Sequence, residues 1–287
     1  MNSVVPSVLL AGCGDIAQRL ALLLQDAYCL TGLRRHPEQL PPVIAPLTAD
    51  LCDSHAVSGA LQGLSYDYVV ITLTPGERSE ARYRQVYIEG TRNLLAALQG
   101  HPRLVFVSST SVYEQDHGEV VDESSPATGS GFSGRILREA EDIVASSGFA
   151  SSCVRFSGIY GPGRERLLRL VREGRVDINN AAQWSNRIHA DDCARVLAFL
   201  IERWQAGIAP SPCYVASDNR PTQLGDVWQW LANQMAVANP VVDSDWRMQP
   251  AKGKRCANDL LQREGFNFLY PDFQEGYLQL LSSMTKL

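Results

Sequence analysis

Short apolar runs alternate with longer segments of helical periodicity through the first half of the chain. Runs of strand length occupy residues 7–11, 27–33, 43–47, 66–74, 103–109 and 151–156. Apolar residues recur every three or four positions, as in amphipathic helices, at 15–25, 77–99 and 132–147. Strands that are apolar on both faces are typical of a parallel sheet covered by helices on each side. The pattern predicts an α/β fold built on a doubly wound parallel sheet.

The second half of the chain is more broken. It predicts a turn and helix at 158–174, a short strand at 213–217, and helices at 189–204, 221–235 and 257–266. No composition shift marks a linker between the halves. We therefore expect a doubly wound domain at 1–156 and a small C-terminal α+β region at 157–287, partly interleaved with the first.

Composition narrows the classes of function. The 287 residues carry a net charge of -5, so no overall positive field attracts nucleic acid or an anionic membrane. No apolar run approaches the ~20 residues that span a bilayer. The first fourteen residues resemble a strand more than a signal peptide, and the odd number of cysteines, seven, includes no C-x-x-C pair. These features predict a cytoplasmic protein with reduced thiols.

A glycine-bearing turn follows the first predicted strand. It gives Gly12-x-Gly14-x-x-Ala17 where a strand passes into a helix. In this context the first glycine permits the tight turn, the second lets a pyrophosphate approach, and Ala17 lets the helix pack on the strand. We expect Asp15 and Ile16, in the first helical turn, to border the same site. The alternative is a plain strand–helix turn.

The ends of the next strands supply further candidate ligands. Arg34 and Arg35 stand where a site for NAD would carry an acid for the ribose 2′-hydroxyl, and guanidinium groups suit a 2′-phosphate. The pattern favours NADP over NAD, although the pair could also be two solvated arginines before a proline turn. Asp50 and Leu51 could meet the adenine, or Asp50 could cap a helix. Three further residues end the fourth strand at the ligand-binding edge: Thr72, Leu73 and Thr74.

Motifs along nearly the whole chain resemble the extended short-chain dehydrogenase/reductase superfamily, in its NAD-dependent epimerase/dehydratase branch. The motifs, in chain order, are "GCGDIA" (12–17), "YIEGTRNLL" (87–95), "FVSSTSVYE" (106–114), "RFSGIYGPGR" (155–164) and "RIHADDCARVL" (187–197). The resemblance implies a Rossmann domain that binds NAD(P) and a smaller substrate region. It also implies that Ser109 binds the reacting oxygen of the substrate and that His189 and Asp192 are structural. We expect Ser108 to lie beside the cofactor, although Ser108 and Ser109 could also be merely polar residues at the end of a strand.

The family's proton-transferring Tyr and its Lys partner are missing. Aligned on the helix at 132–147, Gly131 takes the Tyr position and Arg135 the Lys position. No Tyr-x-x-x-Lys occurs anywhere, because the residues four before the three lysines are Met248, Pro250 and Ser282. Arg135 could still bind ribose or phosphate, but a guanidinium does not release a proton at neutral pH. In lacking this pair, the chain resembles what are called the atypical members of the superfamily.

Several other residues could transfer the proton. Tyr113 follows the serine-rich turn and is our first candidate, with Ser109 and Arg135 as further catalytic residues. Tyr160, Asp122 and Glu123 are further alternatives. A tyrosine in an apolar turn is more often packed with its hydroxyl satisfied.

Two functions remain open from the sequence. One is an NAD(P)-dependent oxidoreductase or isomerase acting on a nucleotide sugar or another small polar substrate. The other is a non-catalytic NAD(P)-binding sensor or regulatory protein. We expect no metal site, because the histidines and cysteines lack ligand spacing. Related proteins often pair into a dimer through the helices that correspond to 77–99 and 132–147, so the resemblance leaves a homodimer as an open alternative.

Overall fold

The computed structural model describes residues 5–129, 131–237 and 244–284. The chain divides into two compact units, and each unit collects three segments. Unit 1 comprises Met1–Glu114, Pro126–Arg155 and Ala194–Tyr214, and unit 2 comprises Gln115–Ser125, Phe156–Cys193 and Val215–Leu287. The chain therefore passes between the units repeatedly, with one of the crossings after Arg155.

A seven-stranded sheet forms the centre of the α/β fold, in the order β11-β7-β5-β4-β1-β2-β3. The pairs β1–β2, β2–β3, β1–β4 and β4–β5 are parallel. Because the chain runs outward from β1 in both directions, the carboxyl ends of β1, β2 and β4 lie side by side, where ligands of such sheets bind. The strands are β1 (Ser7–Ala11), β2 (Cys29–Arg34), β3 (Ala45–Thr48), β4 (Tyr68–Ile71), β5 (Arg103–Ser109), β7 (Ser151–Phe156) and β11 (Cys213–Ala216).

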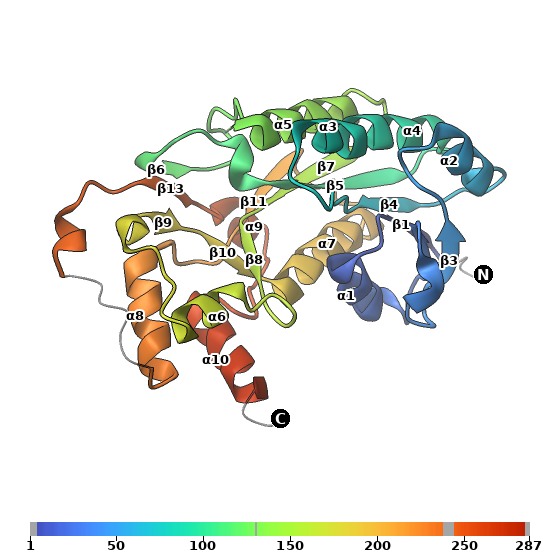
Figure 1. Ribbon diagram of the computed structural model, residues 1–287. Helices are drawn as coiled ribbons and strands as arrows, with labels where there is room; N and C mark the ends of the chain where they lie inside the picture. Colours follow the sequence, from blue (N-terminus) through green and yellow to red (C-terminus); the bar gives the residue numbers. More distant parts are fainter. Residues whose placement is uncertain (1–4, 130, 238–243, 285–287) are drawn as a thin grey trace. The chain divides into compact units, whose positions relative to one another are not determined.

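Helices cover both faces of the unit 1 strands (Figure 1). One face carries α2 (Ser54–Leu61), α3 (Glu80–Tyr83), α4 (Gly90–Ala97) and α5 (Gly131–Ala145), and the other carries α1 (Asp15–Leu24) and α7 (Ala190–Gln205). The central strands β1 and β4 are almost wholly buried, as their unbroken apolar runs predict. The predicted doubly wound fold is confirmed.

The expected single helix at 77–99 is wrong. The structure has α3, then a π-helical turn at Arg84–Glu89, then α4. The wider turn buries Val86, Tyr87 and Ile88, and the Tyr87 hydroxyl donates to the Leu73 carbonyl oxygen at 3.2 Å. Apolar periodicity cannot distinguish such a turn from continuous α-helix, and π-turns are frequent at functional sites.

Unit 2 combines short strand pairs with helices around a separate core. Strand β8 (Gly158–Tyr160) pairs in parallel with β10 (Arg187–His189), and β9 (Trp184–Ser185) pairs antiparallel with β12 (Thr222–Gln223). Strand β6 (His117–Val121) pairs in parallel with β13 (Gly253–Cys256). The helices are α6 (Arg166–Arg172), α8 (Leu224–Gln234), α9 (Asp259–Arg263) and α10 (Phe273–Met284). Side chains of α6, α8 and α10 share one apolar core.

Buried polar residues hold this unit together. The carboxylate of Asp192, which is fully buried, accepts the backbone amides of Leu269 and Tyr270 at 2.8 Å each. The ring of the buried His189 lies 4.0 Å from the Tyr270 ring, measured between centroids. Both side chains thus fix the 269–270 segment against the start of α7.

Asp218 is a buried carboxyl group of the same unit whose hydrogen bonds are only partly satisfied. It is 2% exposed, and its Oδ1 accepts the Arg220 amide at 3.1 Å, but its Oδ2 has no hydrogen-bond partner within the described residues. Burial raises the pKa of this carboxyl from 3.8 to about 7, against the opposing effects of the Arg220 amide and the positive charge of Arg187. Nearby Asp272 raises the pKa further.

We expect the stability of the protein to fall as pH rises from about 4 to 7, because folded Asp218 keeps a proton that the unfolded chain releases. Asp218→Asn should remove this slope and be more stable than the wild type at pH 8, by up to a few kcal/mol at about 1.4 kcal/mol per pKa unit. Thermal unfolding of both proteins between pH 4 and 8 measures the difference. Parallel stability curves across that window would contradict the prediction.

Candidate functional site

A tight backbone contact joins the ends of three neighbouring strands in unit 1. Gly12 follows β1 with φ +78°, and its amide donates to the Leu33 carbonyl oxygen of β2 at 2.9 Å. Its own carbonyl oxygen accepts the hydroxyl of Thr72, just after β4, at 2.8 Å. A Cβ atom on Gly12 would lie 2.7 Å from the Thr72 carbonyl oxygen. Only glycine therefore satisfies both the left-handed backbone and the space at this point.

The turn leaves the N-terminus of α1 open. Gly14 is the N-cap of this ten-residue helix and provides no side-chain cap. A Cβ atom there would meet only the Gly12 carbonyl oxygen, at 3.8 Å. Uncapped N–H groups and the helix dipole attract an anion to such a position. Asp15 instead turns to Arg19, with 2.9 Å between Oδ1 and Nε, and Ile16 and Ala17 are buried behind the turn.

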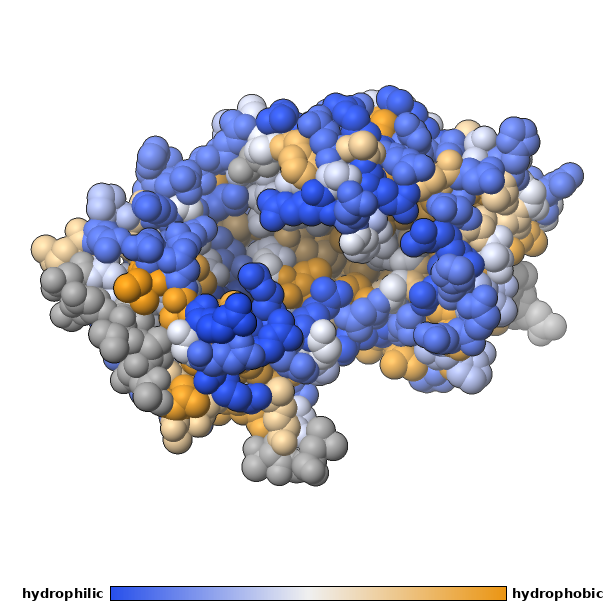
Figure 2. Space-filling view, in the orientation of Figure 1, coloured by the Kyte–Doolittle hydropathy of each residue, from blue (hydrophilic) through white to orange (hydrophobic). Residues whose placement is uncertain are grey.

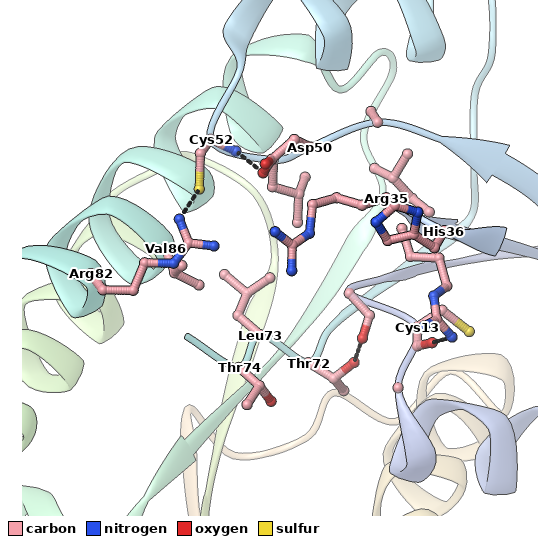
Figure 3. Close-up of a pocket in the computed structure, with 16 residues that line it drawn as sticks. Cys13, Arg35, His36, Asp50, Cys52, Thr72, Leu73, Thr74, Arg82 and Val86 are labelled. Atoms are coloured by element: carbon pink, nitrogen blue, oxygen red, sulfur yellow. Dashed lines mark hydrogen bonds between the residues drawn. The ribbon is translucent and has the colours of Figure 1, made fainter. Parts of the chain in front are cut away.

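The two arginines after β2 have different environments. Arg34 is half-buried, and its guanidinium donates to the Cys13 carbonyl oxygen in the glycine turn at 3.3 Å. Arg35 is exposed and extends into the hollow that the turn borders (Figure 3). Within the described part of the chain, the Arg35 guanidinium has no hydrogen bond or ion pair. Arg34 therefore supports the turn, whereas Arg35 can bind a ligand.

The far side of the hollow carries a third arginine that the sequence analysis missed. Arg82, from α3, donates from Nε to the Pro75 carbonyl oxygen at 3.1 Å and lies 3.8 Å from the Cys52 sulfur (Figure 3). Asp50 accepts the Cys52 amide at 3.0 Å. The helix-capping alternative for Asp50 is wrong, because Asp53 caps α2 by accepting the amides of His55 and Ala56.

Apolar and hydroxyl side chains complete the hollow. Leu33, Leu51, Leu73 and Val86 line it, together with Thr72 and Thr74. All the expected strand-end residues of β2, β3 and β4 thus meet around one space. Asp15, Ile16 and Ala17 lie outside its lining, in α1.

Ser108 is held in a buried ionic network. It donates to Glu141 Oε1 at 2.6 Å, and Arg155 binds the same carboxylate through Nε at 3.0 Å and through its second terminal nitrogen at 2.6 Å. Arg155 also donates to the Tyr113 hydroxyl oxygen at 2.8 Å. Glu141, Arg155 and Ser108 are each 5–6% exposed, and Tyr113 is fully buried. This environment argues against a ligand contact for Ser108 and against Tyr113 as the proton donor.

Ser109 is in a different position from its neighbour. It is partly exposed at the end of β5, and its hydroxyl oxygen accepts the Ser111 amide at 3.2 Å. An oxygen that accepts this bond keeps its proton for donation to another group. Within the described residues the hydroxyl donates no hydrogen bond.

Gly131 and Arg135, which the sequence analysis aligns with the family's Tyr and Lys, lie in the first turns of α5. Gly131 begins the helix with φ +60° and is exposed, and a Cβ atom there would have no atom within 4 Å. Arg135 is exposed one turn later and forms no ion pair among the described residues. Neither side chain can release a proton to a reacting oxygen at neutral pH.

Metal chemistry and thiol chemistry gain no support in the described residues. No group of three or more His, Cys, Asp or Glu side chains gathers there in a way that could hold a metal ion. Cys13, beside the hollow, is buried, and burial raises the pKa of its thiol to about 11 against the opposing charge of Arg34. Burial also raises the pKa of Cys52. Both thiols stay protonated at neutral pH.

Among the described residues, no helix combines the length and the apolar character that a membrane span needs.

The hollow matches the chemistry of a dinucleotide. The uncapped α1 N-terminus and the space above Gly14 can receive a diphosphate, leucine side chains can flank a base, and the unpaired Arg35 can bind another phosphate. This match follows from the chain's own backbone and side chains, without reference to other proteins.

Comparisons with known proteins agree with this geometry. The model of the NAD dependent epimerase/dehydratase family matches residues 14–216. A solved structure from Methylobacillus flagellatus, assigned to the NAD-dependent epimerases/dehydratases, is 34% identical, with a TM-score of 0.86 over 98% of this chain and 100% of that one. Protein YeeZ of Escherichia coli K12 is 28% identical over 225 residues, 77% of each chain. A human epimerase family protein, solved with NADPH, is 19% identical over 94% of this chain and 97% of that one, and its TM-score of 0.73 shows a shared fold.

Alanine at Gly12 and alanine at Gly14 should have separable effects. Gly12→Ala should destabilise the protein by at least 1–2 kcal/mol, about the cost of a left-handed alanine, because the added carbon also meets Thr72. Gly14→Ala should leave the melting temperature nearly unchanged but weaken dinucleotide binding, because its methyl group enters the ligand's space. Thermal melts and fluorescence titration with NADPH measure both effects. Equal melting temperatures for the two variants would contradict the assignment of Gly12.

Proposed function

Because the chain belongs to the NAD-dependent epimerase/dehydratase family, we propose that it is an NADP-dependent oxidoreductase or isomerase acting on a small polar substrate. The observation that carries the cofactor assignment is the unpaired Arg35 guanidinium in the hollow beside Gly12. A nucleotide sugar is one substrate class that fits this proposal. The bound nicotinamide would supply hydride transfer.

The preference for NADP depends on charge at the end of β2. A carboxylate there would repel a 2′-phosphate, whereas Arg35 offers a planar set of donors. Arg34 contributes indirectly by holding the Cys13 carbonyl and the turn.

The chain's own residues would orient the substrate without the usual Tyr. Ser109 can donate its hydroxyl proton in a hydrogen bond to a substrate oxygen, and Arg135 can hold an anionic or ribose oxygen as a permanent cation. A serine hydroxyl polarises a carbonyl but is a poor proton source alone, so water would deliver the proton through it. This arrangement predicts slow chemistry compared with members that carry the Tyr and Lys.

A non-catalytic sensor is the second candidate function. The observation that favours it is the first turn of α5, where Gly131 and Arg135 leave no acid. Such a protein would bind NADPH as tightly as an enzyme but would not consume it. Turnover therefore separates the two candidates, whereas binding does not.

Arg35→Gln and Arg34→Gln should affect the two cofactors differently. Loss of Arg35 should weaken NADPH about 10- to 100-fold and leave NADH nearly unchanged, as expected for one charged hydrogen-bonding group worth about 1.5–3 kcal/mol. Loss of Arg34 should weaken both cofactors, because it loosens the shared turn. Fluorescence titrations of the wild type and both variants provide the measurement. If Arg35→Gln weakens both cofactors equally, the NADP assignment fails.

Ser109→Ala should lower NADPH oxidation at least tenfold with a panel of carbonyl substrates, while NADPH affinity stays unchanged, because the hydroxyl acts on the substrate. Ser109→Thr, which keeps a hydroxyl, should recover most of the rate. The assay follows NADPH absorbance under steady-state conditions. No oxidation by the wild type across the panel would favour the sensor, and an unchanged rate in Ser109→Ala would remove Ser109 from the mechanism.

A further inference from the structure

Positive charge is concentrated on one short segment of unit 2. Residues 164–175 contain five arginines and two glutamates, in a chain whose net charge is -5. All five arginines are exposed. Figure 2 shows hydrophilic side chains gathered over α6. Like charges at helical spacing repel one another, and a bound anion would relieve that repulsion.

The fold of unit 2 fixes which way these arginines point. Arg166, Arg169 and Arg172 recur every three residues and so share one side of α6. Leu168 and Val171, on the other side, are buried in the core of unit 2. The burial of these two side chains fixes the rotation of α6 about its axis, so the three arginines stay on its exposed side.

The three guanidinium groups are not neutralised by neighbouring acids. Within the described residues, the side chains of Arg166, Arg169 and Arg172 form no hydrogen bond or ion pair. The two acids of the segment are engaged elsewhere: Glu165 accepts the Gly163 amide at 3.0 Å, and Glu173 pairs with Arg175 at 3.2 Å.

These arginines border a hollow rather than a flat surface. The hollow has a volume of about 360 Å³, and it is lined by Gly163, Arg164, Glu165, Arg166, Leu168, Arg169, Arg172 and Met284. A concave site suits a small ligand, and guanidinium groups bind phosphate oxygens through paired hydrogen bonds. We propose that this hollow binds the phosphate or diphosphate group of a small molecule.

This site is separate from the dinucleotide hollow. Its lining residues all belong to unit 2, whereas every residue that lines the hollow beside Gly12 belongs to unit 1. The inference therefore holds whether or not the proposed activity is correct. The phosphate could belong to a nucleotide, or it could be free phosphate or diphosphate.

Isothermal titration of the full chain with inorganic pyrophosphate, at constant ionic strength and with saturating NADPH, tests the site. We expect one-to-one binding to the wild type and at least tenfold weaker binding to Arg166→Gln/Arg169→Gln. Glutamine keeps a helix propensity close to that of arginine. The matched control, Arg92→Gln/Arg263→Gln, removes two exposed arginines outside the hollow and should bind as the wild type does.

Several outcomes would overturn the inference. These are absence of pyrophosphate binding by the wild type, equal weakening in the control variant, or unaltered binding after loss of Arg166 and Arg169. Circular dichroism checks folding, and Arg169→Gln alone, expected to weaken binding severalfold, serves if the double variant does not fold. A repeat with uridine diphosphate identifies the source: tighter binding than pyrophosphate indicates a nucleotide, and equal binding indicates free phosphate.

Discussion

The close approach of Gly12 to the end of β4 is the constraint on which the hollow beside Gly12 depends. The amide of Gly12 is bound to Leu33 and its carbonyl oxygen to Thr72, so one residue ties together the ends of β1, β2 and β4. This tie directs the next residues into α1 with the N-terminal amides open. Arg34 then secures the turn from outside through the Cys13 carbonyl oxygen. In the proposed function, the anion site is therefore a property of the backbone, and selection between the two dinucleotides falls to the side chains around it.

Most of this site could be predicted because it is local or follows from topology. The strand, turn and helix at Gly12 are continuous in sequence, and the ends of adjacent parallel strands must lie at one edge of the sheet. Arg82 could not be predicted in the same way. It reaches the hollow from α3, which ends at a π-helical turn, and nothing in the apolar spacing of 77–99 reveals that change of helix type.

The positions of Ser108 and Tyr113 could not be predicted from neighbouring sequence either. Their surroundings depend on Glu141 and Arg155, which are far away along the chain and meet them only in the folded core. A buried carboxylate and guanidinium must satisfy each other and their remaining hydrogen bonds, and the hydroxyls of Ser108 and Tyr113 serve that need. Resemblance to a family places a residue on a strand end, but it does not show which neighbour binds its hydroxyl.

The backbone around Gly131, where the alignment of the sequence expects the family's Tyr, is arranged for glycine. Gly129 packs on the Arg135 backbone and Gly134 on the Ser111 carbonyl oxygen, so that a Cβ atom at either position would collide. Gly131 itself has a left-handed φ that side chains rarely adopt, although the space beside it is open. These glycines bring the start of α5 against the turn that follows Ser109. A tyrosine placed at residue 131 would thus begin from a strained backbone, whereas the dinucleotide hollow around Gly12 does not involve this segment. In the proposed function, cofactor binding beside Gly12 therefore does not depend on which residue transfers a proton near α5.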